Sequence, residues 1–276
     1  MFHCFQHLIH LPFSDGDVPI SRSEFEKLRS FDPSLSPIGE RQVKELGRGI
    51  QLALKKPLSP AIRELRKRSS LPRRQRVVLA VSPMKRTLLT AIPIVESLEH
   101  LHASESIDFK SVDVVPYIYE IGGCYSQRDG VFQGHRGMTD AEAKKVIGRA
   151  NVPASMSNGW WSSDTRETEE ELEARVTKTV EWIRRTAWEG DCDVLVMVTH
   201  QDFACTCMRR LANVSGITWL FNTSTSSFTL TPLVTPDLDP EALLKHSDSS
   251  IGNVHHCKVT IDWLNAADHL SEENIS

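Results

Sequence analysis

Three short apolar runs along the chain have the pattern of buried parallel strands. They extend from Cys4 to Ile9, from Val77 to Val81 and from Val194 to Val198, and polar or turn-forming residues flank each run. Continuous apolar runs rich in β-branched residues are typical of strands that are covered on both faces. Each run is followed by polar residues and then by a helical pattern, which predicts the strand and helix alternation of a doubly wound sheet.

Two segments have the spacing and the end signals of amphipathic helices. One extends from Leu35 to Ile50, where Ser36 is placed to cap the first turn. The other begins after Thr168, which is predicted to form a capping box with Glu171. The apolar stripe of this second helix consists of Leu172, Val176, Val180, Ile183 and Ala187.

The C-terminal part of the chain predicts two more strands, in the stretches SFTLTPLV and HCKVTIDWL. A polar loop over 235–253 separates them, and we expect this loop to be mobile. The whole pattern predicts an α/β fold, a three-layer sandwich with a mostly parallel central sheet and helices on both faces. We find no internal repeat and predict a single domain over residues 1–276 with loop insertions at about 117–160 and about 235–253.

Composition narrows the class of protein further. The 276 residues are 40% hydrophobic, which is enough for a large buried core, and the net charge of -4 is nearly balanced. A balanced charge gives no reason to expect nucleic acid or an anionic membrane as a partner. No apolar run reaches the roughly 18 residues that span a bilayer, and no signal peptide is recognisable, so we expect a cytoplasmic protein. The cysteines lack the paired spacing of a zinc site, and we predict no metal.

Two other features have a structural explanation. The segment from Leu58 to Arg76 is rich in arginine and lysine, and we expect it to be a solvated helix end and loop. The adjacent Trp160 and Trp161 are expected to fold back onto the core.

Residues suited to phosphate binding follow each of the three predicted parallel strands. They are His10 after the first strand, Ser82 and Arg86 after the second, and His200 after the third. Ligands bind beyond the carboxyl ends of the strands in an open parallel sheet, so these side chains should converge. The helix predicted to begin after Ser82 would add its positive N-terminus and its free backbone N–H groups. Singly, Arg86 could be a surface ion-pair partner and His200 a strand cap, but together they indicate an anion site with a possible nucleophile.

Four motifs stand along the chain in the order LSPIGERQVKELG, VSPMKRTLLTA, the glutamate of YEIGG and VTHQDF, and they are followed by the endings SSFTLTPL and VTIDWLNAADHL. In this order and at these separations, they resemble the histidine phosphatase superfamily in its phosphoglycerate mutase-like branch. The resemblance covers the chain from about Cys4 to Leu270. It implies phosphoryl transfer in two steps, without metal or cofactor: a histidine attacks phosphorus, and water then hydrolyses the phosphohistidine.

The resemblance also implies a role for each residue that matches a motif. His10 would be the nucleophile, Arg86 would bind the phosphoryl group, and His200 would be a second phosphate-binding imidazole. Glu120 would protonate the leaving oxygen, provided that burial or the nearby phosphate raises its pKa. Asp202 is an alternative donor, because some relatives carry an aspartate just after the second histidine.

The opening stretch departs from the family pattern. Family members carry Arg-His-Gly at the end of the first strand, whereas Ile9, His10 and Leu11 stand here. The missing arginine removes charge-assisted hydrogen bonds worth about 1.5–3 kcal/mol each, and Arg22 is a candidate to replace its charge. A different register, in which His7 stands at the end of the strand, is also open.

The predicted function is a metal-independent phosphatase acting on a phosphorylated small molecule or a phosphoprotein. The glycine-rich, basic segment over 117–138 would be its substrate lid. A phosphomutase is less favoured, because a second phosphate needs further cationic contacts. The alternative class is a catalytically impaired phosphatase-like protein that binds a phosphorylated ligand or a protein partner, which the altered Arg-His-Gly position favours. A nucleotide-dependent enzyme lacks support, since no glycine-rich phosphate-binding motif is present.

Overall fold

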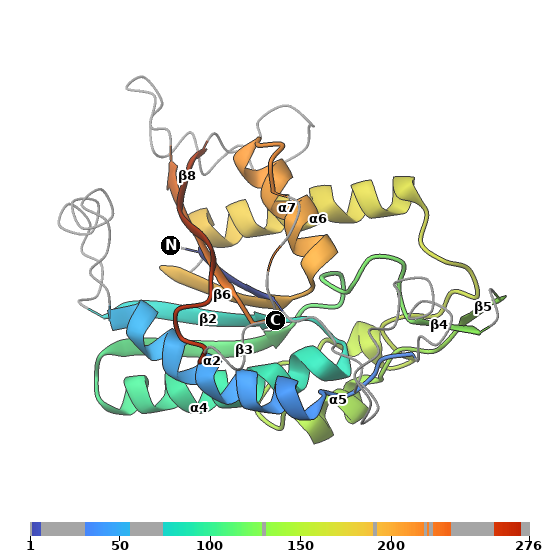
Figure 1. Ribbon diagram of the computed structural model, residues 1–276, viewed down its shortest axis with the longest axis horizontal. Helices are drawn as coiled ribbons and strands as arrows, with labels where there is room; N and C mark the ends of the chain where they lie inside the picture. Colours follow the sequence, from blue (N-terminus) through green and yellow to red (C-terminus); the bar gives the residue numbers. More distant parts are fainter. Residues whose placement is uncertain are drawn as a thin grey trace.

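The central element of the fold is a six-stranded sheet with helices on both faces (Figure 1). The computed structural model describes residues 2–6 (backbone only), 31–55, 74–128, 131–189, 192–217, 220, 223–232 and 257–271. The predicted α/β class with its three layers is confirmed. Residues 7–30 and the loop over 235–253, which was expected to be mobile, lie outside the described residues.

The strands of the sheet follow the order β3-β2-β6-β1-β7-β8. Their bounds are Phe2–Gln6 for β1, Gln75–Val81 for β2, Ile107–Val114 for β3, Val194–Thr199 for β6, Thr225–Pro232 for β7 and Cys257–Ala266 for β8. The pairs β3–β2, β2–β6 and β6–β1 are parallel, and β7 and β8 are antiparallel to their neighbours. The prediction of a mostly parallel sheet is therefore confirmed. The first strand begins two residues earlier than the sequence pattern predicted.

Within the described residues, four helices cover the two faces of the sheet. Their bounds are Pro37–Lys55 for α2, Lys85–Ala103 for α4, Glu169–Glu189 for α6 and Gln201–Ala212 for α7. Helices α2 and α4 lie on one face, and α6 and α7 lie on the other (Figure 1). Helix α4 follows β2 and returns the chain to the start of β3, which is why these two neighbouring strands point the same way.

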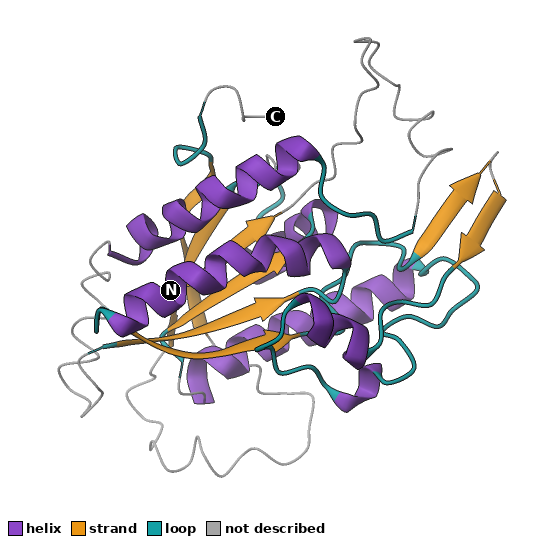
Figure 2. Ribbon diagram, turned by 90° about the horizontal axis from the view of Figure 1, so that it is seen from below, coloured by secondary structure: helices purple, strands orange, loops and turns teal. Residues whose placement is uncertain are grey.

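A smaller subdomain follows β3. It contains β4 (Tyr125–Arg128), β5 (Val131–Gly134), α5 (Asp140–Val146) and the short helix η1 (Ala154–Met156). The two strands form an antiparallel hairpin. Figure 2 shows this hairpin clear of the main sheet, on the side toward which the parallel strands point. It therefore projects from the edge where the candidate site lies.

The predicted caps form where the sequence places them. The Ser36 hydroxyl accepts a 3.1 Å hydrogen bond from the amide of Gly39 in the first turn of α2. At the start of α6, the amide of Thr168 donates to Glu171 Oε2 at 2.9 Å and the amide of Glu171 donates to Thr168 Oγ1 at 3.2 Å. Both helices thus begin as the local sequence predicts, since a cap needs only neighbouring residues.

The two faces of the sheet are separated by the alternation of side chains along each strand. In β2, Leu79 packs into the core beside α2 and α4, while Ala80 packs into the core beside α6 and α7. In β6, Val196 and Met197 divide in the same way. Because both faces of the sheet are buried, the sequences of β2 and β6 contain continuous apolar runs. The adjacent Trp160 and Trp161 are buried in the first of these cores, as predicted.

One residue of the basic segment was wrongly expected to be solvated. Arg76, in β2, is buried and forms a two-point ion pair with Asp193, with Nε to Oδ2 at 3.0 Å and Nη2 to Oδ1 at 3.1 Å. The backbone of Arg76 also accepts from the amide of Asp193 at 2.8 Å. The pair lies where β2 and β6 begin, so it ties these strands together at the amino edge of the sheet.

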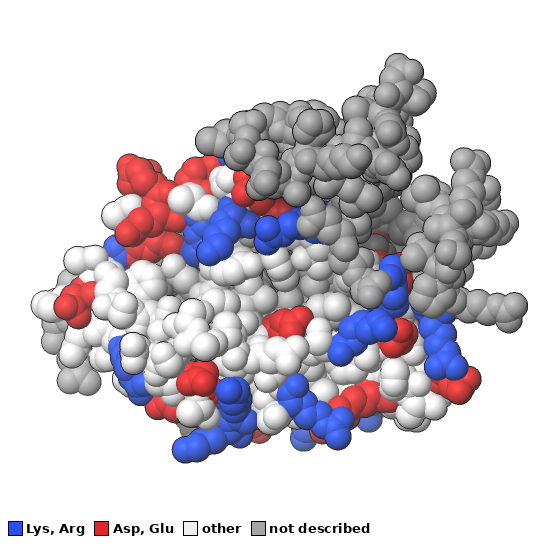
Figure 3. Space-filling view, turned by 180° about the vertical axis from the view of Figure 1, so that it is seen from behind, with Lys and Arg blue, Asp and Glu red and all other residues white. Residues whose placement is uncertain are grey.

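The charged surface carries both signs. Figure 3 shows Lys and Arg side chains interspersed with Asp and Glu around the rim of one face, with uncharged surface between them. Within the part of the chain that the structure describes, none of the helices combines the length and the apolar character needed to cross a membrane.

Candidate active site

Three of the predicted site residues meet at the carboxyl edge of the sheet. Ser82 directly follows β2 and His200 directly follows β6, and the amide of Ser82 donates to Val198 O at 2.9 Å. Arg86 lies in the first turn of α4. Ser82 and His200 are 0% exposed and Arg86 is 2% exposed. Adjacent parallel strands end at the same edge, so residues that are more than 110 positions apart come into contact.

The hydrogen bonds of His200 define the protonation of its ring. Arg86 Nη2 lies 3.0 Å from His200 Nδ1, and Ser82 Oγ lies 2.7 Å from His200 Nε2. A guanidinium only donates, so Nδ1 accepts, and in the neutral ring the proton is on Nε2, which donates to Ser82. His200 therefore holds the guanidinium of Arg86 in a fixed orientation and is tied in turn to the end of β2.

Glu120 reaches the same edge through the segment that follows β3. The amide of Val115 donates to Val81 O at 2.9 Å, and Thr199 Oγ1 donates to Ile118 O at 2.8 Å, directly before His200. Glu120 is 9% exposed, and its Oε1 accepts a 2.8 Å hydrogen bond from the amide of Ile121. Asp202, the alternative donor, is exposed in the first turn of α7.

A residue that sequence reasoning missed is Asp32. Its Oδ1 accepts a 2.7 Å hydrogen bond from the amide of Lys85, the first residue of α4. That amide was predicted to be free for a ligand, and it is instead occupied by a carboxylate. Burial raises the pKa of Asp32 to about 6, although the nearby Arg86 and the bond from Lys85 oppose this shift. The Asp-Pro dipeptide just before the Ser36 cap is the only local signal, and it marks a turn rather than a site.

The titration of Asp32 predicts a pH-dependent stability. The stabilisation from its protonated form is fully present below the unfolded pKa of 3.8 and is lost as the pH rises through about 6. Asp32→Asn keeps an acceptor for Lys85 and removes the charge of this partly buried carboxylate. We expect the variant to be more stable than the wild type by about 1–3 kcal/mol near pH 8 and no more stable near pH 3.5. Urea unfolding at pH 8 and at pH 3.5 measures the difference in the free energy of unfolding. An equal dependence of this free energy on pH in the two proteins would contradict the prediction.

The position of β1 bears on the nucleophile. In the pairing of β1 with β6, Gln6 lies opposite Thr199, and in the sequence His7 and His200 are the residues that follow them. The predicted His10 and Arg22 lie outside the described residues, as do His7 and Leu11. The structure therefore brings together Ser82, Arg86 and His200, with the segment of Glu120 beside them.

The predicted lid segment contains the β4–β5 hairpin. His135 Nε2 lies 2.6 Å from Ser126 Oγ, and the His135 ring stacks on Phe31 with 4.2 Å between ring centroids. Arg136 donates to Glu142 Oε1 at 2.9 Å. These two basic side chains therefore have protein partners, and the stacking joins the hairpin to the residues that precede α2.

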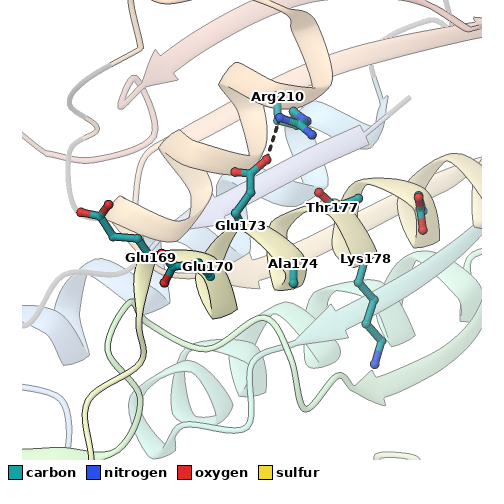
Figure 4. Close-up of a pocket in the computed structure, with 8 residues that line it drawn as sticks. Glu169, Glu170, Glu173, Ala174, Thr177, Lys178 and Arg210 are labelled. Carbon is teal, nitrogen blue, oxygen red and sulfur yellow. Dashed lines mark ion pairs between the residues drawn. The ribbon is translucent and has the colours of Figure 1, made fainter.

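A separate surface hollow lies on α6 and α7 (Figure 4). It is lined by Glu169, Glu170, Glu173, Ala174, Thr177, Lys178, Glu181 and Arg210. Arg210 is paired with Glu173 at 2.7 Å, and the glutamates leave an excess of negative charge that repels phosphate. Among the residues that the structure describes, no group of three or more His, Cys, Asp or Glu side chains could hold a metal ion.

The fold and the site together define an α/β protein with a buried guanidinium and imidazole cluster at the carboxyl edge of its sheet. No family model matches the sequence. No curated protein matches it either. Comparison with solved structures finds matches across nearly the whole chain to members of the histidine phosphatase superfamily, at low sequence identity.

Three of these matches are described by their TM-score, sequence identity and coverage. The chain is similar to a structure named mycobacterial hydrolase 2, with a TM-score of 0.49, 14% identity, and coverage of 99% of this chain and 93% of that chain. It is similar to a mycobacterial glucosyl-3-phosphoglycerate phosphatase, with a TM-score of 0.46, 14% identity, and coverage of 96% and 98%. It is also similar to a phosphoserine phosphatase from Entamoeba histolytica, with a TM-score of 0.47, 14% identity, and coverage of 98% of each chain.

Proposed function

We propose that this protein is a metal-independent phosphomonoester phosphatase that acts through a phosphohistidine intermediate. The observation that carries the proposal is the buried cluster of Arg86, His200 and Ser82 at the carboxyl edge of the sheet. A guanidinium held in place by a neutral imidazole is a preorganised donor for the equatorial oxygens of a transferring phosphoryl group.

The proposed nucleophile is a histidine just beyond β1. The register of β1 supports His7, because Gln6, which precedes His7 in the sequence, lies opposite Thr199, which precedes His200. His10 is three residues farther along, a distance of about 10 Å in an extended chain. With His7 in this role, Gln6 stands where the family carries arginine and Leu8 where it carries glycine.

The chemistry proceeds in two balanced steps. The neutral imidazole attacks phosphorus in line, the phosphorus–oxygen bond of the ester breaks, and the protonated carboxyl of Glu120 gives its proton to the departing oxygen. The Glu120 carboxylate then takes a proton from water, which attacks the phosphohistidine and releases inorganic phosphate. Arg86 stabilises the charge on the phosphoryl oxygens in both steps, and His200 and Ser82 keep Arg86 in place.

A specific observation also favours the second candidate function, a phosphatase-like protein that binds a phosphorylated ligand without turning it over. Neither Gln6-His7-Leu8 nor Ile9-His10-Leu11 contains the arginine and the glycine of the family pattern. A missing guanidinium weakens transition-state stabilisation more than it weakens binding, because the developing charge is largest in the transition state.

One assay separates the two candidates. We expect the wild-type protein to hydrolyse p-nitrophenyl phosphate in the presence of a chelator, and orthovanadate to inhibit competitively by imitating the five-coordinate phosphorus. Titration calorimetry with inorganic phosphate provides the binding measurement. Turnover that requires added metal would contradict the metal-independent mechanism. Phosphate binding without turnover across a panel of phosphomonoesters would establish the binding protein instead.

A further inference from the structure

A buried ion pair lies beneath the segment that carries Glu120. Arg175 Nε donates to Glu167 Oε1 at 2.6 Å and Arg175 Nη2 donates to Glu167 Oε2 at 2.6 Å. The side chains of Arg175 and Glu167 are 6% and 2% exposed. Since a buried ion pair loses the hydration of both charges, it is weak evidence for stability alone. A role of the pair in holding neighbouring parts of the chain in place is therefore the better explanation.

The pair contacts the backbone on both sides of Glu120. Arg175 Nη1 donates to Tyr119 O at 2.8 Å and to Tyr117 O at 3.2 Å, which lie before Glu120 in the sequence. The amide of Gly122, which follows it, donates to Glu167 Oε2 at 3.1 Å. All these contacts are charge-assisted, so they are stronger than neutral hydrogen bonds and fix the geometry more closely.

Aromatic rings and glycine geometry complete this arrangement. The guanidinium carbon of Arg175 lies 3.8 Å from the centroid of the Tyr119 ring and 4.2 Å from that of Phe203, on the helix that follows His200. Gly122 has a φ of 94°, a left-handed conformation that turns the chain two residues after Glu120 and suits glycine. The ion pair is thus packed between the glutamate segment and the helix next to the imidazole.

We propose that Glu167 and Arg175 are positioning residues that hold the Glu120 carboxyl at the leaving-group side of the phosphoryl site. This inference rests on the proposed phosphatase function. A general acid must lie within hydrogen-bond reach of the oxygen that it protonates, and a displacement of about 1 Å is enough to slow the reaction strongly. The Glu167–Arg175 pair fixes the backbone on both sides of the acid, and the carboxyl itself accepts a hydrogen bond from the amide of Ile121.

The leaving group supplies the test. An alkyl phosphate needs a proton on the departing oxygen, whereas p-nitrophenolate leaves readily without one. In Glu167→Gln, kcat/KM for an alkyl phosphomonoester such as glycerol 2-phosphate should fall at least about tenfold more than kcat/KM for p-nitrophenyl phosphate. A purely structural loss would reduce kcat/KM for both substrates by the same factor.

The chain provides a matched control at the opposite edge of the sheet. Asp193 and Arg76 also form a buried ion pair with two hydrogen bonds, and both side chains are 9% exposed. Asp193→Asn neutralises that pair as Glu167→Gln neutralises this one. We expect it to lower thermal stability and to leave the ratio between the two substrates unchanged.

A second variant covers the case in which Glu167→Gln does not fold. Arg175→Lys keeps the buried charge balanced, but an ammonium cannot reach both carboxylate oxygens and two carbonyl oxygens together. It should shift the substrate ratio in the same direction. If the wild type turns over both substrates and neither variant changes their ratio, the positioning role is wrong while the phosphatase function stands. If the wild type turns over neither, the proposed function fails and the positioning role fails with it.

Discussion

The His7→Ala variant is expected to lose phosphatase activity by about three orders of magnitude or more, while His10→Ala keeps most of it. Without the nucleophilic nitrogen no phosphohistidine forms, and water must attack the ester directly. The expectation follows from the register of β1, in which Gln6 lies opposite Thr199, immediately before His200. Steady-state hydrolysis of p-nitrophenyl phosphate by both variants measures it.

Two controls make the assignment specific to the nucleophile. Added imidazole should restore part of the turnover of His7→Ala, because it enters the space that the side chain leaves and accepts the phosphoryl group. Rapid acid quenching is unsuitable for trapping, since phosphohistidine is labile in acid, so the labelled intermediate should be isolated at alkaline pH. Loss of activity in His10→Ala alone would assign the nucleophile to His10. Full activity in both variants would contradict the phosphohistidine mechanism.

Arg86→Ala is the second large effect. We expect kcat/KM for p-nitrophenyl phosphate to fall by about 10²–10⁴, because a bidentate phosphate contact contains two charge-assisted hydrogen bonds of about 1.5–3 kcal/mol each. The guanidinium is 2% exposed and is held by His200, so little solvent screens it. Kinetics with the substrate and inhibition by orthovanadate measure the loss.

The neighbouring Lys85 provides the control for this substitution. Its side chain is exposed in the same turn of α4, so Lys85→Ala removes one positive charge without touching the buried cluster. We expect kcat/KM for p-nitrophenyl phosphate to change by less than about threefold in Lys85→Ala, since an exposed charge is well screened. The loss of kcat/KM in Arg86→Lys should lie between those of Lys85→Ala and Arg86→Ala, because this variant keeps the positive charge but loses the planar guanidinium. Equal losses in Lys85→Ala and Arg86→Ala would show that only the overall charge matters.

The meeting of Ser82, Arg86 and His200 could be predicted from the sequence because a general rule about parallel sheets governs it. Continuous apolar runs identified β2 and β6, and the residues that follow such strands share one edge. The caps at Ser36 and Thr168 were predictable for a similar reason. Their hydrogen bonds join residues only three positions apart.

The remaining features depend on contacts between distant segments. Glu167 and Arg175 look like ordinary charges of a surface helix and its flank, and only the packing of the 117–122 segment over them buries the pair. Arg76 belongs to a basic run that predicts a solvated segment, yet Asp193, 117 positions away, draws it into the sheet. β3 was missed although its alternating pattern is typical of a strand with one polar face.

The sequence by itself determined the class of fold, the helix starts and the meeting of Ser82, Arg86 and His200, because these depend on local periodicity and on one rule of chain topology. The tertiary structure alone decided the pairing register that places the end of β1 beside His200, the occupation of the α4 amide by Asp32, and the contacts of the Glu167–Arg175 pair with the Glu120 segment. These features arise from burial and pairing between segments far apart in the chain. No local pattern encodes them, because the free energy of a charged group depends on what surrounds it after folding.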